Sequence, residues 1–235
     1  MIEERVTPGI SPAEVMQEHI DRYEFAKKYV SGKSVLDVAC GSGYGSFMLA
    51  ETATSVSGVD ISADAIEYAK TNYSASNIQY YQDNATHLLF YDDSFDVVVS
   101  FETIEHIKDY KTFLSECRRV LKPGGIFICS TPNSLVSSPD GNIENPYHVI
   151  EFSYEEFNST LQDHFSSIEV HGQHDINSFK ELVFKSYFWI KGKLGIKRAL
   201  FCRDNSEISF PVCDFKNGFV NSAYMIVVCK GAVKC

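Results

Sequence analysis

The chain has 235 residues, of which 21 are basic and 31 acidic, giving a formal charge of −10. This length allows one α/β domain with a substantial core, and we expect a single domain over residues 1–235. The acidic balance repels a phosphate backbone, so a nucleic-acid partner is disfavoured. Seven cysteines without a CxxC pair predict reduced thiols. Because no apolar run resembles a signal core or a membrane span, the sequence predicts a cytoplasmic protein; it indicates no oligomeric state.

Apolar, β-branched runs alternate with helical patterns in the first part of the chain. A helix is expected over residues 11–30. Strands are then predicted at 35–39, 56–59, 78–81, 95–100 and 126–130, and helices at 44–50, 63–73 and 110–121. Strand and helix repeated in this way are typical of a parallel, doubly wound sheet.

The pattern loosens after Thr131 into a loop rich in Pro, Asn, Ser and Gly, and a helix is predicted at 154–161. Strands near 168–171 and 224–229 follow, separated by an aromatic and basic segment at 179–203. Long loops at the carboxyl edge of such a sheet usually serve a ligand. We therefore expect lid-like insertions at about 132–153 and 178–205.

The segment "VLDVACGSGYG" places Asp37 at the end of a strand and then three glycines before a helix, namely Gly41, Gly43 and Gly45. Glycines allow a sharp turn and a close approach of the backbone to a ligand at the helix N-terminus. Asp60, which ends the next strand, can accept hydrogen bonds from both hydroxyls of a ribose. Asp83, which ends the third, can lie beside an adenine amino group. The order of these features predicts a nucleoside-bearing cofactor.

The chain resembles the class I S-adenosylmethionine-dependent methyltransferases over nearly its whole length. The resemblance is carried by "VLDVACGSGYG", "VSGVDIS", "QDNA", "FDVVVSFETIEHI" and "LKPGGIFICSTPN". It implies an α/β fold, a Rossmann-like doubly wound sheet of seven strands in the order 3-2-1-4-5-7-6 with an antiparallel last strand. It also implies S-adenosylmethionine as the cofactor and methyl transfer, most simply to oxygen, as the activity.

The same resemblance implies which residues contact the cofactor. After the first strand these are Asp37, Ala39, Gly41, Gly43 and Tyr44; after the second, Asp60 and Ile61; after the third, Asp83, Asn84 and Ala85; and at the fourth, Ser100 and Phe101. The loop after the first strand is expected at the methionine part, Asp60 at the ribose and Asp83 at the adenine. In the N-terminal helix, Arg22 and Tyr23 are expected to reach the cofactor, with Arg22 at its carboxylate. The alternative, a helix that only covers the sheet edge, stays open.

The stretch "SFETIEHI" follows the fourth predicted strand and carries two carboxylates and an imidazole. If a helical turn follows Ser100, Glu102, Glu105 and His106 fall at i, i+3 and i+4 and share one face. His148, in the long loop over the same edge, could supply a fourth ligand. Mixed oxygen and imidazole ligation suits Mg, Mn, Fe, Co or Zn better than Ca. A bound cation would orient a hydroxyl and lower its pKa.

This stretch is similar to the Glu-x-x-Glu-His motif of small-RNA 2′-O-methyltransferases and ubiquinone-pathway O-methyltransferases, in which it holds a catalytic metal. The resemblance implies a metal site at Glu102, Glu105, His106 and His148. In the alternative, no metal binds, Glu102 is solvated, and His106 acts alone as a general base or packs in the fold. The sequence leaves both interpretations open.

The acceptor is predicted from the loop that follows Thr131. Its "NPYHVIEF" segment looks like that of methyltransferases of bacterial glycan assembly, which implies a sugar hydroxyl on a nucleotide sugar or a growing polysaccharide. Hydrogen-bonding side chains suited to hydroxyls are Asn133, Asn142, Asn145 and Tyr147. The basic segment 179–203 offers two alternatives, a lipid-like or quinone-like acceptor presented at a membrane surface, or RNA. A lid over the acceptor pocket is a simpler interpretation of that segment, and a non-catalytic cofactor-binding subunit has no need of the Glu-Glu-His cluster.

Overall fold

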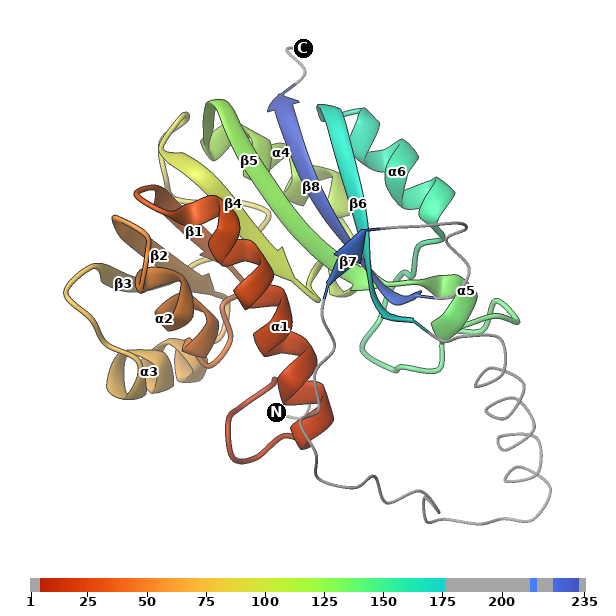
Figure 1. Ribbon diagram of the computed structural model, residues 1–235, viewed down its shortest axis with the longest axis horizontal. Coiled ribbons are helices and arrows are strands. Elements are labelled where there is room, and N and C mark those ends of the chain that lie inside the picture. The colour runs from red at the N-terminus through yellow and green to blue at the C-terminus, as the bar shows by residue number, and fades with distance from the viewer. Residues whose placement is uncertain (1–4, 176–211, 215–221, 233–235) are drawn as a thin grey trace.

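The computed structural model describes residues 5–175, 212–214 and 222–232. Its strands are β1 (Ser34–Val38), β2 (Ser55–Asp60), β3 (Ile78–Gln82), β4 (Phe95–Phe101), β5 (Leu121–Pro132), β6 (Phe165–Asp175), β7 (Cys213–Asp214) and β8 (Ser222–Ala232). Its helices are α1 (Ala13–Val30), α2 (Tyr44–Ala50), α3 (Ala63–Asn72), η1 (Ile104–His106, a 3-10 turn), α4 (Tyr110–Val120), α5 (Ser134–Ser137) and α6 (Tyr154–Gln162). Figure 1 shows these elements around one twisted sheet.

The sheet has the strand order β3-β2-β1-β4-β5-β8-β6-β7. Strands β1 to β5 are parallel, whereas β8 runs antiparallel to both of its neighbours, β5 and β6. Without β7, which adds two residues at one edge, the order in the chain is 3-2-1-4-5-7-6. The predicted fold class and its antiparallel last strand are therefore confirmed.

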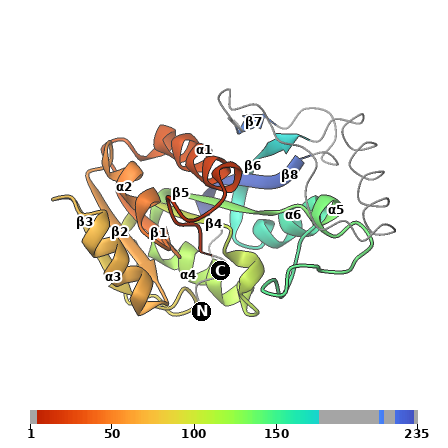
Figure 2. The ribbon, with the colours of Figure 1, turned by 90° about the horizontal axis from the view of Figure 1, so that it is seen from below.

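Helices cover both faces of the sheet, which explains why its central strands are mostly apolar on both faces. On one face, α1 and α2 pack on alternate strand residues such as Val35 and Val97. On the other face, α4 and α6 pack on residues such as Leu36 and Val98. Figure 2, seen from the edge of the sheet, shows α1 and α6 on opposite sides of the strands. Side chains that alternate along one strand thus belong to two separate cores.

The predicted elements up to the fifth strand are present, with small shifts at their ends. Ser62 caps α3 by accepting a hydrogen bond from the backbone of Ala65 at 3.3 Å, as its position before the helix predicts. Strand β5 begins five residues earlier than expected, directly after α4, with an irregular register against Phe95. Neither the short helix α5 nor the turn η1 has a periodic pattern, because each is a single turn.

Candidate functional site

The loop between β1 and α2 is organised around the buried carboxylate of Asp37. Asp37 Oδ2 accepts a 2.6 Å hydrogen bond from the Ser46 hydroxyl, and both of its oxygens lie 3.3 Å from the Tyr23 hydroxyl. Burial raises the pKa of Asp37 to about 7, although the bonds from Ser46 and Tyr23 oppose the shift. This carboxylate is suited to a cationic group such as an ammonium.

The backbone of this loop adopts conformations that favour glycine. Ala39, Gly41 and Gly43 have φ values of 60°, 55° and 88°. A Cβ on Gly43 would also lie 2.5 Å from the Cβ of Ala69, so this glycine permits close packing of α2 on α3. The third glycine, Gly45, serves a different contact, because a Cβ there would lie 1.9 Å from the ring of Tyr23 in α1.

The acidic residues after β2 and β3 are held by backbone N–H groups. Asp60 accepts from Gly41 at 3.0 Å and from Ser62 at 2.8 Å. Asp83 accepts from Asn84 at 2.8 Å and from Leu89 at 2.9 Å. These bonds fix the carboxylates at neighbouring strand ends, where the sequence predicts ribose and adenine.

Two exposed apolar side chains accompany these carboxylates. Ile61 is 69% exposed and Leu89 is 77% exposed. Apolar side chains at such a position could pack on the faces of the adenine ring that the sequence predicts there. Ile61 is predicted from the sequence, whereas Leu89 is not, since it belongs to no motif. Asn84 uses its side-chain oxygen to accept bonds from Thr86, and Ala85 packs partly against the core.

The predicted N-terminal contributors lie at the same edge of the sheet. Arg22 is fully buried; its Nε donates to Gln173 at 2.7 Å, and its guanidinium lies 4.2 Å from the ring centre of Tyr224. Its Nη1 is 3.7 Å from Glu102 Oε1, yet neither Nη atom has a hydrogen-bond partner among the described residues. A buried cation with free donors is suited to a carboxylate ligand.

Aromatic rings lie between Arg22 and the end of β4. Tyr23 makes edge-on contacts with Phe101 at 5.0 Å and with Tyr44 at 5.7 Å between ring centres. Ser100 is buried, and its hydroxyl donates to the backbone oxygen of Val38 at 3.0 Å, which joins β4 to β1. Tyr23 and Phe101, both predicted to contact the cofactor, thus lie against each other at the end of β4, while the Ser100 hydroxyl is engaged within the sheet.

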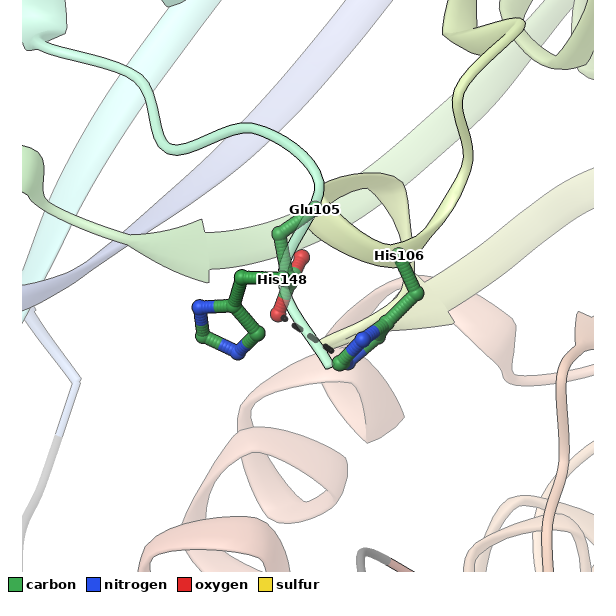
Figure 3. Close-up of side chains that lie close together, drawn as sticks. All are labelled: Glu105, His106 and His148. Atoms are coloured by element: carbon green, nitrogen blue, oxygen red, sulfur yellow. Dashed lines mark ion pairs between the residues drawn. The ribbon is translucent and has the colours of Figure 1, made fainter. Parts of the chain in front are cut away.

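Three of the four predicted metal ligands come together beyond β4. Ligand atoms of Glu105, His106 and His148 all lie within 4.8 Å of one another (Figure 3). The turn η1 presents Glu105 and His106, and the loop before α6 brings His148 over them. The loop is tied there because Val149 N donates to the backbone oxygen of Glu105 at 2.8 Å. A site of two imidazoles and a carboxylate results.

The hydrogen bonds of this cluster assign the protons of His106. Its Nδ1 lies 3.1 Å from the backbone oxygen of Tyr147, which can only accept, so Nδ1 carries the hydrogen. The lone pair is then on Nε2, which lies 3.9 Å from Glu105 Oε1. His106 is therefore arranged to accept a proton or to bind a cation through Nε2.

Glu105 is a buried acid with one unpaired oxygen. Its Oε2 accepts from the Thr131 hydroxyl at 3.1 Å, whereas its Oε1 has no hydrogen-bond partner among the described residues. Burial, and then the nearby Glu102 carboxylate, raise the pKa of Glu105 well above its ordinary value. A cation beside Oε1 would compensate the buried charge.

Glu102 does not join this cluster, contrary to the helical turn predicted from the sequence. Its φ of 50° is left-handed, and the turn η1 begins only at Ile104, so the expected shared face does not form. Glu102 Oε1 accepts from the Ser130 hydroxyl at 2.6 Å and faces Arg22. The carboxylate thus lies on the α1 side of the site. The metal-free alternative expects a solvated Glu102, but its side chain is only 15% exposed.

The asparagines of the 132–153 loop are engaged within the loop itself. Asn133 is buried and bonds the backbone of Ser222 and Leu135. Asn142 donates to Asp140 at 2.9 Å, and Asn145 accepts from the backbone of Tyr147 at 3.0 Å. The loop also exposes four large apolar side chains: Leu135, Ile143, Tyr147 and Val149 are 43%, 40%, 42% and 54% exposed.

Comparisons with known proteins agree with this arrangement. Residues 36–129 match the family described as a methyltransferase domain. The crystal structure of an S-adenosylmethionine-dependent methyltransferase, possible histamine N-methyltransferase, from Thermotoga maritima superposes with a TM-score of 0.63 at 17% identity, over 91% of this chain and 89% of that one. Residues 36–129 thus resemble a methyltransferase domain, and the described sheet has the strand order of the class I methyltransferase fold.

Curated relatives align with the methyltransferase domain and its flanks. A probable S-adenosylmethionine-dependent methyltransferase of Mycolicibacterium smegmatis is 35% identical over 161 residues, which are 68% of this chain and 62% of that protein. A ubiquinone biosynthesis O-methyltransferase of Cereibacter sphaeroides is 39% identical over 104 residues, 43% of this chain and 42% of that protein. The chain thus spans about half the length of these relatives.

Two side chains that support the candidate site were not among the predicted residues, although Glu151 lies in the "NPYHVIEF" segment. Gln173 holds Arg22, and Glu151 holds His148, with Nδ1 of the histidine 2.6 Å from Oε1. A histidine followed by an acidic residue three positions later was the only signal available for the second pair.

The described helices of the methyltransferase fold include none that is long and apolar enough to cross a membrane. The basic segment 179–203 and the whole predicted insertion at 178–205 lie outside the described residues.

Proposed function

We propose that the protein transfers the methyl group of S-adenosylmethionine to a hydroxyl oxygen of its acceptor. The observation that carries this proposal is the cluster of Glu105, His106 and His148 at the end of β4, beside the residues expected around the cofactor. Methyl transfer from a sulfonium is an in-line displacement, so the protein has to position the acceptor and remove its proton. An alcohol hydroxyl needs such help because its pKa is comparable to that of water, about 15.7, and a phenol, with a pKa of about 10, also keeps its proton near neutral pH.

The polar groups at the strand ends support S-adenosylmethionine as the methyl donor. Asp37 offers a buried carboxylate for the ammonium of the methionine part, and Arg22 offers unpaired donors for its carboxylate. The carboxylate of Asp60 can accept hydrogen bonds from the ribose hydroxyls. Ile61 and Leu89 offer apolar surface for the adenine.

The donor set of the cluster fits a divalent cation. Two imidazoles and one carboxylate are ligands suited to Mn, Fe, Co or Zn, whereas Mg prefers a site made of oxygen ligands. The buried Glu105 Oε1, which has no hydrogen-bond partner in the described part of the chain, is where a positive charge is most needed. When bound, a cation would polarise the acceptor hydroxyl and lower its pKa. We propose Glu105, His106 and His148 as its ligands, without Glu102.

His106 can also act without a cation. Its Nε2 carries the lone pair and can take the proton as the acceptor oxygen attacks the methyl carbon. The new bond joins oxygen to carbon, the old carbon–sulfur bond gives its electron pair to sulfur, and S-adenosylhomocysteine leaves. Glu105 and the Tyr147 backbone oxygen hold the imidazole in place for this step.

The exposed side chains of the 132–153 loop favour an acceptor with an apolar body, such as a quinol or a lipid-like alcohol. Tyr147 and Val149 flank His148 in sequence, and both bond the cluster through their backbone atoms. The O-methyltransferase relative of ubiquinone biosynthesis is compatible with this class of acceptor. A peripheral membrane contact would present such an acceptor.

A sugar hydroxyl is the second candidate, supported by the "NPYHVIEF" segment. The asparagines expected to bind it are largely engaged in the loop, so Tyr147 and the histidines would have to recognise its hydroxyls. RNA is the weakest candidate, since the formal charge of the chain is −10.

Calorimetry with S-adenosylmethionine, followed by transfer of labelled methyl to a panel of acceptors, tests the proposal. We expect micromolar cofactor binding and transfer to a demethylated quinol rather than to nucleotide sugars or RNA. Transfer after exhaustive EDTA treatment and after Mn²⁺ re-addition separates cation assistance from the His106 base. An absence of cofactor binding would contradict the whole proposal. Methyl transfer to a sugar alone would contradict the proposed apolar acceptor and favour the sugar hydroxyl.

A further inference from the structure

His148 is held by a second acidic residue that lies outside the cluster. Its Nδ1 is 2.6 Å from Oε1 of Glu151, and the two side chains are only 10% and 3% exposed. A short contact of a buried carboxylate with an imidazole is a charge-assisted hydrogen bond, which restricts the rotation of the ring. The pair is therefore built into the loop rather than formed at its surface.

The carboxylate of Glu151 is itself fixed from the other side. The hydroxyls of Ser137 and Ser138, at the end of α5, both donate to its Oε2, the second of them at 2.6 Å. With both serine hydroxyls donating to Oε2, Oε1 is the oxygen that accepts from the histidine ring, so Nδ1 of His148 carries the hydrogen.

A separate contact leads to the same assignment. Asn145 accepts from the backbone N–H of Tyr147 through Oδ1, which orients its amide. Its Nδ2 then faces Nε2 of His148 at 2.9 Å. Because an amide nitrogen only donates, Nε2 must hold the lone pair. A cation at Nε2 would take the place of this hydrogen bond.

We propose that Glu151, supported by Ser137 and Ser138, is a positioning residue that fixes His148 with its lone pair on Nε2 for a divalent cation. This inference rests on the cation site proposed above. Ligand histidines commonly donate their other N–H to such a partner, and loss of the partner lowers metal affinity about 10- to 100-fold. For His106 the partner is a backbone oxygen, so Glu151 is the partner that a substitution can remove.

Binding of Mn²⁺ to the full chain, measured by electron paramagnetic resonance and calorimetry, tests this assignment. We expect Glu151→Gln to weaken Mn²⁺ binding about 10- to 100-fold. The matched control is Glu155→Gln, the same change at an exposed position of α6 that should leave affinity unchanged. If Glu151→Gln does not fold, Ser137→Ala combined with Ser138→Ala should weaken binding in the same direction by a smaller factor. Wild-type affinity in the folded variant would overturn the inference.

Imidazole nitrogen shifts in NMR spectra of the cation-free protein give a second readout. In the wild type we expect His148 as the Nδ1–H tautomer, and in Glu151→Gln a mixture of tautomers. Persistence of the pure Nδ1–H form would contradict the role of Glu151. A wild type with the expected tautomer that binds none of Mn²⁺, Mg²⁺, Co²⁺ or Zn²⁺ would instead remove the cation site, so the two failures are distinguishable.

Discussion

The proposed cofactor region, at the ends of β1, β2 and β3, and the proposed acceptor region, at the end of β4, differ in how their polar groups are satisfied. After β1, β2 and β3, the carboxylates of Asp37, Asp60 and Asp83 all have hydrogen-bond donors. At the end of β4, Glu105 keeps one buried oxygen without a donor among the described residues, and Glu102 adopts a left-handed backbone.

This contrast indicates two ways of preparing a site for its ligand. The cofactor region is shaped by backbone turns and close helix packing, and its carboxylates are fixed before anything binds. Each region contains a non-glycine residue with a left-handed backbone, Ala39 in the first and Glu102 in the second. The second also holds a buried carboxylate oxygen without a donor among the described residues, a cost to stability that persists where function requires it. Substitutions should therefore affect binding and folding in the first region, and catalysis in the second.

Replacement of His106 should give the largest effect and separate the two regions. We expect His106→Ala to lower kcat roughly 10²- to 10⁴-fold, because it removes both a cation ligand and a base. Affinity for S-adenosylmethionine, measured by calorimetry, should stay within twofold. His164→Ala, a histidine at the far end of α6, serves as the control and should leave both values unchanged. A large loss of cofactor affinity in His106→Ala would show that the two regions are not functionally separate.

The buried carboxylate of Asp37 should make stability depend on pH. Its pKa of about 7 lies above the ordinary 3.8, so the folded state binds the proton more tightly than the unfolded state. The free energy of unfolding should therefore fall as pH rises from about 4 to about 7, by on the order of 4 kcal/mol. Urea denaturation of the wild type and of Asp37→Asn measures this, and only the wild type should show this component. A difference between them that is constant with pH would contradict it.

Gly45 tests whether helix packing shapes the cofactor region. We expect Gly45→Ala to destabilise the fold by roughly 1–3 kcal/mol, because the new methyl group would overlap the ring of Tyr23. In a Tyr23→Ala background the same change should be neutral or slightly stabilising, since alanine favours a helix more than glycine. Thermal denaturation of the wild type, the two single variants and the double variant gives the coupling energy between Gly45 and Tyr23. An equal loss of stability from Gly45→Ala with and without the Tyr23 ring would contradict the predicted overlap.

Substitution of Glu105 should give the smallest effect on stability. It should stabilise the fold while lowering activity. Its raised pKa means that the ionised form costs stability as pH increases. At pH 8 we expect Glu105→Gln to raise the free energy of unfolding by about 1 kcal/mol while transfer activity falls. At pH 5 the gain should shrink. Glu67→Gln, on the exposed face of α3, is the control, and destabilisation by Glu105→Gln at pH 8 would contradict the account.

Most of the fold could be predicted because its signals are local. Strands β1 and β4 are covered on both faces and appear as continuous apolar runs, and the glycines and acids follow in chain order. The strand order came from the family resemblance. The contact of Gly45 with Tyr23 could not be read from the sequence, because it depends on the approach of two helices.

The candidate site was predicted less completely for two physical reasons. Spacing alone suggests a shared face for Glu102 and Glu105, but the backbone of Glu102 turns left-handed, and its side chain meets Ser130. Asparagine indicates hydrogen bonding without saying to what, and Asn133 bonds its own loop. The support that Glu151 gives to His148 depends on serines brought close by the turn at α5.

The separation of the two acids has a consequence for any attempt to transplant this site into another protein. Ser130 and Thr131 are consecutive residues of β5, and their hydroxyls bond Glu102 and Glu105 respectively. A shift of one residue between β5 and β4 would put Thr131 and Pro132, or Cys129 and Ser130, at these two positions, so one of the acids would lose its hydroxyl partner. A graft of the Glu-x-x-Glu-His sequence alone would therefore fail, whereas one that also copies the pairing of Ser130 with Phe101 would carry both acids in place.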